Sequence, residues 1–195
     1  MTDVAATAPL DEDSFFELIA TREGRFELHD GVIYAMAGGT RAHALISSRA
    51  LRALGNLADR RGCEAYGPDF YIGITNAHGR DLVSPDAWVR CGPSDPQARS
   101  ADDPVVVVEV LSPSTMAFDR GGKLELYFSI PSLQHVLLVY QHAMRVELWS
   151  RTPREGREDS WEVTHHEDPA GDIPLAALEG TIPLRGLYEG LDLTL

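Results

Sequence analysis

The sequence is poor in cysteine and lysine, and it lacks long apolar runs. Its 195 residues include two cysteines, Cys63 and Cys91, and a single lysine, Lys123. Two cysteines without C-x-x-C spacing are too few for a disulfide framework or a structural zinc site, so we expect a reducing cytoplasm. No window approaches the roughly 18 apolar residues of a membrane helix, and no basic signal-peptide start is visible. We therefore expect neither a membrane-spanning nor an exported protein.

Net positive charge is also lacking, which bears on nucleic-acid binding. The chain has 17 basic and 30 acidic residues and a formal net charge of -13. Because nonspecific DNA affinity comes largely from neutralising phosphates, this charge argues against a tight general DNA binder. The excess lies at the ends, since residues 1–30 carry -6 and residues 154–195 carry -7, whereas residues 31–153 are balanced. The neutral central span remains compatible with nucleic-acid contact.

The composition is that of an ordinary folded domain, with 44% hydrophobic and 24% charged residues. Its length favours one domain over residues 1–195, with a flexible tail at 1–9 and a β-rich C-terminal appendage at 160–195. The order of elements predicts an α/β (α+β) fold in which one mixed sheet is flanked by helices. Predicted helices cover residues 10–20, 40–61 and 123–130. Predicted strands cover residues 63–67, 69–75, 81–89, 104–111, 135–141, 144–151 and 161–167. A hairpin is expected to turn at Asp30-Gly31, and a loop is expected at residues 90–104.

Glu109 is the most informative single residue. It interrupts the valine run PVVVVEVL, which predicts a strand buried on both faces. Alternation places Glu109 on one face with Val107 and Leu111, and Val106, Val108 and Val110 on the other. An ionised carboxylate there costs several kcal/mol unless it is paired, hydrogen-bonded or bound to a metal. A cationic partner is therefore expected, either a structural arginine or a functional group.

Asp86 and Lys123 are the other two candidates from the residues alone. Asp86 follows Pro85 and opens an apolar strand that we expect to lie antiparallel to the Glu109 strand, with the two carboxylates converging. Such a pair suits Mg²⁺, which takes one or two carboxylates plus water and phosphate oxygens. Lys123 opens the next helix, where its amine is expected either to reach back over the strand or to pair with Asp119 or Glu125 in solvent.

These segments, in order, resemble a known family. FELHDGVIYAM, His43, PDAWV, VVVVEVLSPST, DRGGK and YFSIPSLQHVLLV are similar to the Uma-two family of restriction endonucleases, within the PD-(D/E)xK nuclease superfamily. The resemblance covers residues 26–149. It implies a restriction-endonuclease-like core, with Asp86 and Glu109 as metal carboxylates, Lys123 as the basic member and Glu27 as an additional acidic member. The superfamily's usual lysine position is Leu111 here, and the resemblance implies that the lysine has moved to the following helix.

Each of the other polar residues considered allows two interpretations. Glu27 alternates with apolar neighbours and either joins the site or faces solvent. His43 lies on the core-facing stripe of the helix over 40–61, either as a hydrogen-bonded core histidine or as a partner for a proton or phosphate. Arg41, Arg49, Arg52 and Arg60 lie on roughly the opposite side of this helix, as a solvated face or as a phosphate track. Nucleic-acid contacts are assigned to His43, Arg41, Arg49 and Arg52.

The sequence thus predicts a Mg²⁺- or Mn²⁺-dependent endonuclease acting on nucleic acid, most naturally DNA. A homodimer is expected because cutting both strands favours two sites. The alternative is a catalytically silent protein of the same fold that binds nucleic acid or a protein partner. A hydrolase of sugars requires two carboxylates about 5–10 Å apart with no lysine between them, and the acidic residues alone support it.

Overall fold

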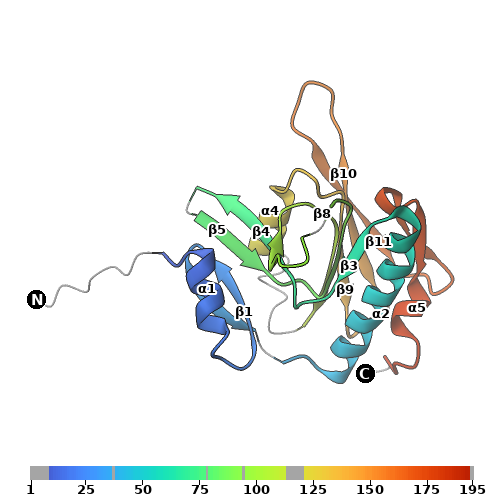
Figure 1. Ribbon diagram of the computed structural model, residues 1–195. Helices are drawn as coiled ribbons and strands as arrows, with labels where there is room; N and C mark the ends of the chain where they lie inside the picture. Colours follow the sequence, from blue (N-terminus) through green and yellow to red (C-terminus); the bar gives the residue numbers. More distant parts are fainter. Residues whose placement is uncertain (1–8, 37, 78, 94, 113–120, 194–195) are drawn as a thin grey trace, which may run out of the picture.

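The computed structural model describes residues 9–36, 38–77, 79–93, 95–112 and 121–193. Two larger sheets and one small sheet are arranged with helices around them (Figure 1). The α/β class with mixed sheets and flanking helices agrees with the sequence prediction, but the single expected sheet is divided into two. Among the described helices, none is both long enough and apolar enough to cross a membrane.

The first sheet contains the predicted hairpin at residues 25–36. Its strand order is β2-β1-β5-β4-β7, and Asp30 and Gly31 take the positive φ angles that the tight turn requires. Helix α1 begins after the cap residue Asp11 and buries Phe15 and Phe16 against this sheet. The elements are α1 (Glu12–Ile19), β1 (Arg25–His29), β2 (Val32–Met36), β4 (Tyr71–Asn76), β5 (Gly79–Val83) and β7 (Ser100–Ala101).

The second sheet holds the valine-rich strand at its centre. Its order is β11-β10-β9-β8-β6-β3, in which β8 and β9 run parallel and the other neighbours antiparallel. Helix α4 lies in the connection between β8 and β9. These elements are β3 (Glu64–Tyr66), β6 (Ala87–Arg90), β8 (Pro104–Leu111), α4 (Gly122–Phe128), β9 (His135–Tyr140), β10 (Val146–Thr152) and β11 (Ser160–His166).

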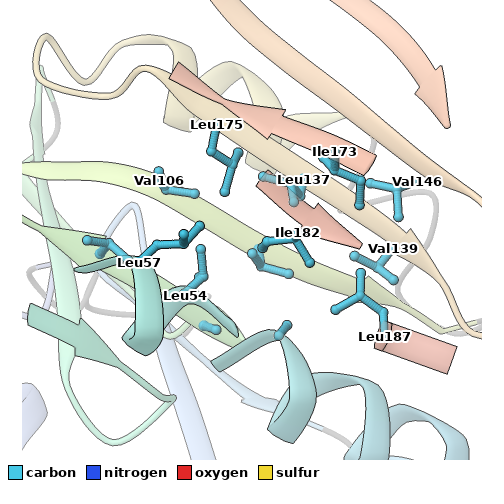
Figure 2. Close-up of a cluster of buried hydrophobic side chains, with 14 of the residues drawn as sticks. Leu54, Leu57, Val106, Leu137, Val139, Val146, Ile173, Leu175, Ile182 and Leu187 are labelled. Carbon is cyan, nitrogen blue, oxygen red and sulfur yellow. The ribbon is translucent and has the colours of Figure 1, made fainter. Parts of the chain in front are cut away.

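Two separate apolar clusters lie on the two faces of this second sheet. Helix α2 and the C-terminal elements cover one face, where Leu54 and Leu57 meet Val106, Leu137 and Ile182 (Figure 2). Helix α4 covers the other face through Leu124 and Tyr127, which pack with Val107 and Leu111. The remaining elements are α2 (Arg41–Ala58), η1 (Asp59–Arg61), β12 (Asp172–Leu175), η2 (Ala176–Leu178), β13 (Gly180–Pro183) and α5 (Leu184–Tyr188).

The alternation predicted for β8 is confirmed over residues 106–111, whereas Val105 packs against the cluster under α2, where the β6–β8 register shifts. Val106, Val108 and Val110 belong to the cluster under α2, while Val107 and Leu111 belong to the cluster under α4. Thr40 caps α2 as predicted, since its hydroxyl accepts the backbone N–H of His43 at 3.2 Å. The predicted tail at residues 1–9 lies almost entirely outside the described residues, as does Asp119, one of the alternative partners predicted for Lys123.

The segment 81–89 was predicted as one strand, and this is wrong. Residues up to Val83 belong to β5 in the first sheet, and residues from Ala87 belong to β6 in the second. Ser84, Pro85 and Asp86 carry the chain from one sheet to the other, because proline lacks the N–H that a continuous ladder needs. The predicted loop at 90–104 also contains the short strand β7, which pairs in parallel with β4.

The structure also contains a disulfide, where the sequence predicted no disulfide framework. Cys63 precedes β3 and Cys91 follows β6, and their sulfur atoms are bonded. The antiparallel register pairs Glu64 with Arg90, so the two cysteines face each other at the next position along the strands. A sequence separation of 28 residues gives no sign of this proximity, which depends entirely on the strand pairing.

Candidate active site

A buried lysine joins two carboxylates from different sheets. Lys123, the second residue of α4, has only 1% of its side chain exposed. Its Nζ atom lies 2.9 Å from Glu27 Oε1 of β1 and 3.0 Å from Glu109 Oε1 of β8. An ammonium taken out of water needs such compensation, because an unpaired buried charge is strongly destabilising. The only lysine of the chain therefore bridges the two sheets rather than facing solvent.

Glu27 is held as a carboxylate by its surroundings. Its Oε1 accepts the backbone N–H of Ser84 at 2.9 Å, and its Oε2 lies 3.1 Å from His29 Nε2. Burial alone raises the pKa of Glu27, but the Lys123 charge and the hydrogen bonds from His29 and Ser84 outweigh it and lower the pKa to about 2. Glu27 is therefore ionised throughout the physiological pH range.

Glu109 shares the lysine and gains a second donor from the same helix. Tyr127 lies one turn after Lys123 on α4, is fully buried, and donates its phenol hydrogen to Glu109 Oε1 at 2.5 Å. The predicted cationic partner of Glu109 is thus Lys123, in the geometry where its amine reaches back over the strand. Glu109 is therefore paired with Lys123 instead of a structural arginine, and Lys123 is buried instead of paired with Glu125 in solvent.

Asp86 lies beside Glu109 at the point where the chain crosses between the sheets. The β6–β8 register pairs Ala87 with Val108, so Asp86 stands at the level of Glu109. Its Oδ2 accepts the backbone N–H of Val110 at 2.9 Å. It is 7% exposed and lies 3.3 Å from His43 Nε2, while Arg25 approaches its other oxygen at 3.9 Å. Two strands and a backbone hydrogen bond therefore hold this carboxylate in place.

A cavity of about 370 Å³ opens next to Asp86. His43, Arg25 and Ser47 are among its lining residues, and the first turns of α2 form one wall. Arg25 and Pro68 also line a neighbouring cavity of about 290 Å³ that includes Arg99. The two cavities therefore adjoin at Arg25 and Pro68.

The predicted residues are only partly gathered at this place. Glu27, Glu109 and Lys123 are in contact, and Asp86 and His43 form an adjoining pair, so His43 is a site-facing rather than a core histidine. Arg41 lines a different cavity, at the N-terminus of α2. Arg49 and Arg52 do not line the Asp86 cavity. The catalytic and nucleic-acid-binding roles assigned to these residues remain predictions.

Sequence reasoning missed four residues that support the site. Arg25 and His29 lie at two-residue spacing from Glu27 on β1, which puts all three on one face. Tyr127 lies at i+4 from Lys123, a spacing that brings side chains together on a helix. Both periodicities were visible in the sequence. The Ser84 contact was not, because it depends on the crossing between the sheets.

Carboxylate oxygens such as those at this site suit a hard divalent cation that takes few of its ligands from the protein. Within the described part of the chain, no group of three or more His, Cys, Asp or Glu side chains is arranged to hold a metal ion. Mg²⁺ needs only one or two carboxylates, since water and substrate phosphate oxygens complete its octahedron. Asp86, which lines the cavity, and Glu109, on β8, are the two carboxylates that the sequence predicted for such an ion.

Comparisons with known proteins agree with this architecture. Residues 12–181 match the Uma2 (Uma-two) family, described as "Putative restriction endonuclease". The chain is 34% identical over 190 residues to the uncharacterised protein slr1290 of Synechocystis sp., covering 95% of this chain and 96% of that protein. A second Synechocystis protein, sll1609, is 27% identical over 154 residues, covering 77% of this chain and 86% of the relative.

A solved structure shares the fold. It is the crystal structure of "a putative nuclease belonging to DUF820" from Anabaena variabilis, with a TM-score of 0.64 and 15% sequence identity. The alignment covers 92% of this chain and 98% of the other. At that identity the likeness concerns the fold, and the chemistry has to be argued from the side chains.

Proposed function

Because the chain belongs to the Uma2 family of proteins described as restriction endonucleases, we propose that it is a metal-dependent nuclease that hydrolyses phosphodiester bonds of DNA. The observation that carries this proposal is the bridge of Lys123 between Glu27 and Glu109, with Asp86 alongside. Four charged side chains with at most 7% exposure are held here by ion pairs and hydrogen bonds, and one of them, Asp86, lines an open cavity. Replacing such a buried ionic cluster with apolar residues often costs a fold nothing, which favours a functional reason for keeping it.

Asp86 and Glu109 are the residues that would hold the ion, which we propose to be Mg²⁺ or Mn²⁺. When bound, such an ion activates water and offsets negative charge on a phosphate. Val110 and Tyr127 fix the two carboxylates by hydrogen bonds, so little reorganisation accompanies binding. Preorganisation of this kind supplies much of the rate enhancement in charged active sites.

Lys123 is proposed to act on the attacking water and the phosphate, and Glu27 is proposed to hold Lys123 in place. The Lys123 ammonium beside Glu109 orients the attacking water and stabilises charge on the phosphate oxygens. The water oxygen forms the new bond to phosphorus as the bond to one ester oxygen breaks; the water gives up one proton to solvent, and the departing oxygen takes one proton from solvent. Glu27 keeps the lysine charged and in position, because its own pKa stays near 2.

The substrate path is proposed to follow the cavity beside Asp86. Arg25 and His43 line this cavity, and Arg99 lies further along the neighbouring one. These groups match a phosphate backbone, and two of them, His43 and Arg99, belong to residues 31–153, whose net charge is zero. Cleavage of both DNA strands further favours a homodimer, which presents two such sites.

Plasmid and oligonucleotide cleavage with Mg²⁺ or Mn²⁺ tests the proposal. Wild type is compared with Asp86→Asn, with Lys123→Ala, and with Glu158→Gln, which removes one negative charge from an exposed position. We expect the first two variants to lose at least about a hundredfold in rate and Glu158→Gln to match wild type. Circular dichroism separates a lost fold from a lost site, and Asp86→Asn retains the hydrogen-bond acceptor for Val110.

Two results would count against the proposal. Equal cleavage by all four proteins would reject the site assignment. Absence of cleavage by folded wild type on single- and double-stranded DNA and RNA, together with no heat of Mn²⁺ binding in calorimetry, would favour the catalytically silent alternative. That alternative treats the Lys123 cluster as a structural ion pair retained in a binding protein.

A further inference from the structure

A second cavity, separate from the one beside Asp86, lies at the N-terminus of α2. Its volume is about 390 Å³, and it is lined by residues 40–42, 141–142 and 191–193. The two cavities lie on different sides of the first turn of α2, because Gly39, His43 and Ala44 line the cavity beside Asp86. The nuclease chemistry proposed above makes no use of this second cavity.

Gln141 places an unpaired donor at this cavity. The residue is 2% exposed, and its Oε1 accepts the Thr40 hydroxyl at 2.5 Å. The Thr40 oxygen accepts the N–H of His43 as the helix cap, while its hydroxyl hydrogen is donated to Gln141 Oε1. Gln141 Nε2 has no hydrogen-bond partner among the described residues. A buried amide donor without an acceptor is costly, so an external acceptor is expected.

The surrounding groups determine the charge of that acceptor. The N–H groups of Arg41 and Ala42 begin an 18-residue helix and have no intrahelical acceptor, and the helix dipole makes this end positive. The exposed side chains of Arg41 and His142 border the same cavity. Asp192 is the one carboxylate among the described lining residues, against the two basic side chains of Arg41 and His142. An anion with several acceptor oxygens fits this arrangement.

We propose that this cavity is a phosphate-binding site for a nucleotide unit. The phosphate oxygens accept from Gln141 Nε2 and from the first N–H groups of α2, and Arg41 supplies the countercharge. Leu191 and Leu193 give the cavity an apolar wall for the nucleoside. The assignment of the phosphate to nucleic acid rests on the proposed nuclease function, whereas the phosphate site itself stands independently of it. On a nucleic-acid strand crossing the start of α2, this site would hold a phosphate away from the one being cleaved.

Nuclear magnetic resonance titration without divalent metal tests the site directly. Inorganic phosphate and a 5′-mononucleotide are added separately, and the signals of the Gln141 side-chain amide and the Arg41 and Ala42 backbone amides are followed. We expect saturable shifts confined to this region. Gln141→Glu keeps an oxygen for Thr40 but opposes an anion, so it should weaken binding at least about tenfold. Arg41→Gln should weaken binding about fivefold, and Arg52→Gln, an equal charge change elsewhere on α2, less than about twofold.

The variants also separate this inference from the nuclease proposal. Asp86→Asn should bind phosphate as wild type does, even where it cleaves nothing. Comparing an oligonucleotide with the mononucleotide then identifies the source of the phosphate: tighter oligonucleotide binding that Gln141→Glu removes supports a nucleic-acid backbone. The inference is overturned if neither phosphate nor mononucleotide shifts the Gln141 amide saturably. It is also overturned if Arg52→Gln weakens binding as much as Arg41→Gln, because the attraction is then general electrostatics.

Discussion

Tyr127 donates its phenol hydrogen to Glu109 at 2.5 Å, and it does so from the helical turn after Lys123. The same oxygen of Glu109 lies 3.0 Å from the Lys123 amine. One short helix thus supplies two donors to one buried carboxylate. This arrangement leaves the position of Glu109 dependent on α4 as well as on its own strand, which gives the first prediction.

Tyr127→Phe should destabilise the protein by about 1.5–3 kcal/mol, because a buried carboxylate loses a hydrogen bond while the ring packing remains. Urea unfolding at neutral pH measures the change. Tyr34→Phe is the matched control, since Tyr34 is 51% exposed and should change stability by less than about 0.5 kcal/mol. Nuclease activity of Tyr127→Phe should also fall. Unchanged stability in Tyr127→Phe would mean that the phenol does not hold Glu109.

Lys123→Met should cost about 3–5 kcal/mol of stability. The substitution removes the cation between Glu27 and Glu109 and leaves two buried negative charges without compensation. Adding Glu27→Gln to Lys123→Met should restore about 1 kcal/mol or more, because one of the two carboxylates is then neutral. A double-mutant cycle in urea measures this coupling. Strictly additive effects of the two substitutions would show that Lys123 and Glu27 do not interact energetically.

Acid stability should depend on Glu27 in a defined pH window. The pKa of Glu27 is lowered from 4.5 in the unfolded chain to about 2 in the fold, despite the opposing effect of burial. A depressed carboxyl pKa contributes stability that is fully present above pH 4.5 and is lost as the pH falls towards 2, and it amounts to about 3 kcal/mol. Unfolding free energies of wild type and Glu27→Gln should therefore converge across this window. A constant difference between the two proteins from pH 5 to pH 2 would contradict the prediction.

His135 should determine how the free energy of unfolding depends on pH in a second, higher pH range. Burial lowers the pKa of His135 from 6.5 to about 4, and its neutral Nε2 accepts the backbone N–H of Ala177 at 3.3 Å. The unfolded chain binds this proton more readily, so the related stability is present above pH 6.5 and is lost as the pH falls towards 4. His135→Gln should flatten the pH dependence of unfolding between these values. The exposed-site substitution His165→Gln should leave it unchanged, and an equal effect of both would reject the role of His135.

The sequence was informative about the site where a local pattern was broken. Glu109 could be selected because it interrupts a valine run, and the predicted antiparallel neighbour relation between its strand and the Asp86 strand is confirmed. The contact between Lys123 and Glu109 could be predicted because it requires only that the helix after the Glu109 strand pack back over that strand. These relations involve neighbouring elements, for which periodicity and turn residues carry most of the information.

Relations between distant segments were not predictable in the same way. Residues 81–89 form one β-rich segment of the sequence, and although Pro85 marks a break in a strand, it does not show that residues 84–86 pass between two sheets. The crossing nevertheless brings the N–H of Ser84 to Glu27 and Asp86 to the N–H of Val110. The pairing of Glu27 with Lys123 likewise joins residues 96 positions apart, and only the resemblance to a family suggested it.

The Cys63–Cys91 disulfide should contribute about 3–4 kcal/mol to stability, because it closes a loop with a sequence separation of 28 and restricts the unfolded chain. Unfolding in urea should show this loss equally in wild type with reductant and in the Cys63→Ser/Cys91→Ser variant without it. Reductant should not affect the variant further, which controls for general effects of the reagent. The bond follows the C-terminal end of β6, whereas Asp86 precedes the N-terminal end of that strand, so stability should fall without moving the Lys123 contacts. If reductant leaves wild-type stability unchanged under conditions where free thiols appear, the disulfide does not stabilise the fold by restricting the unfolded chain.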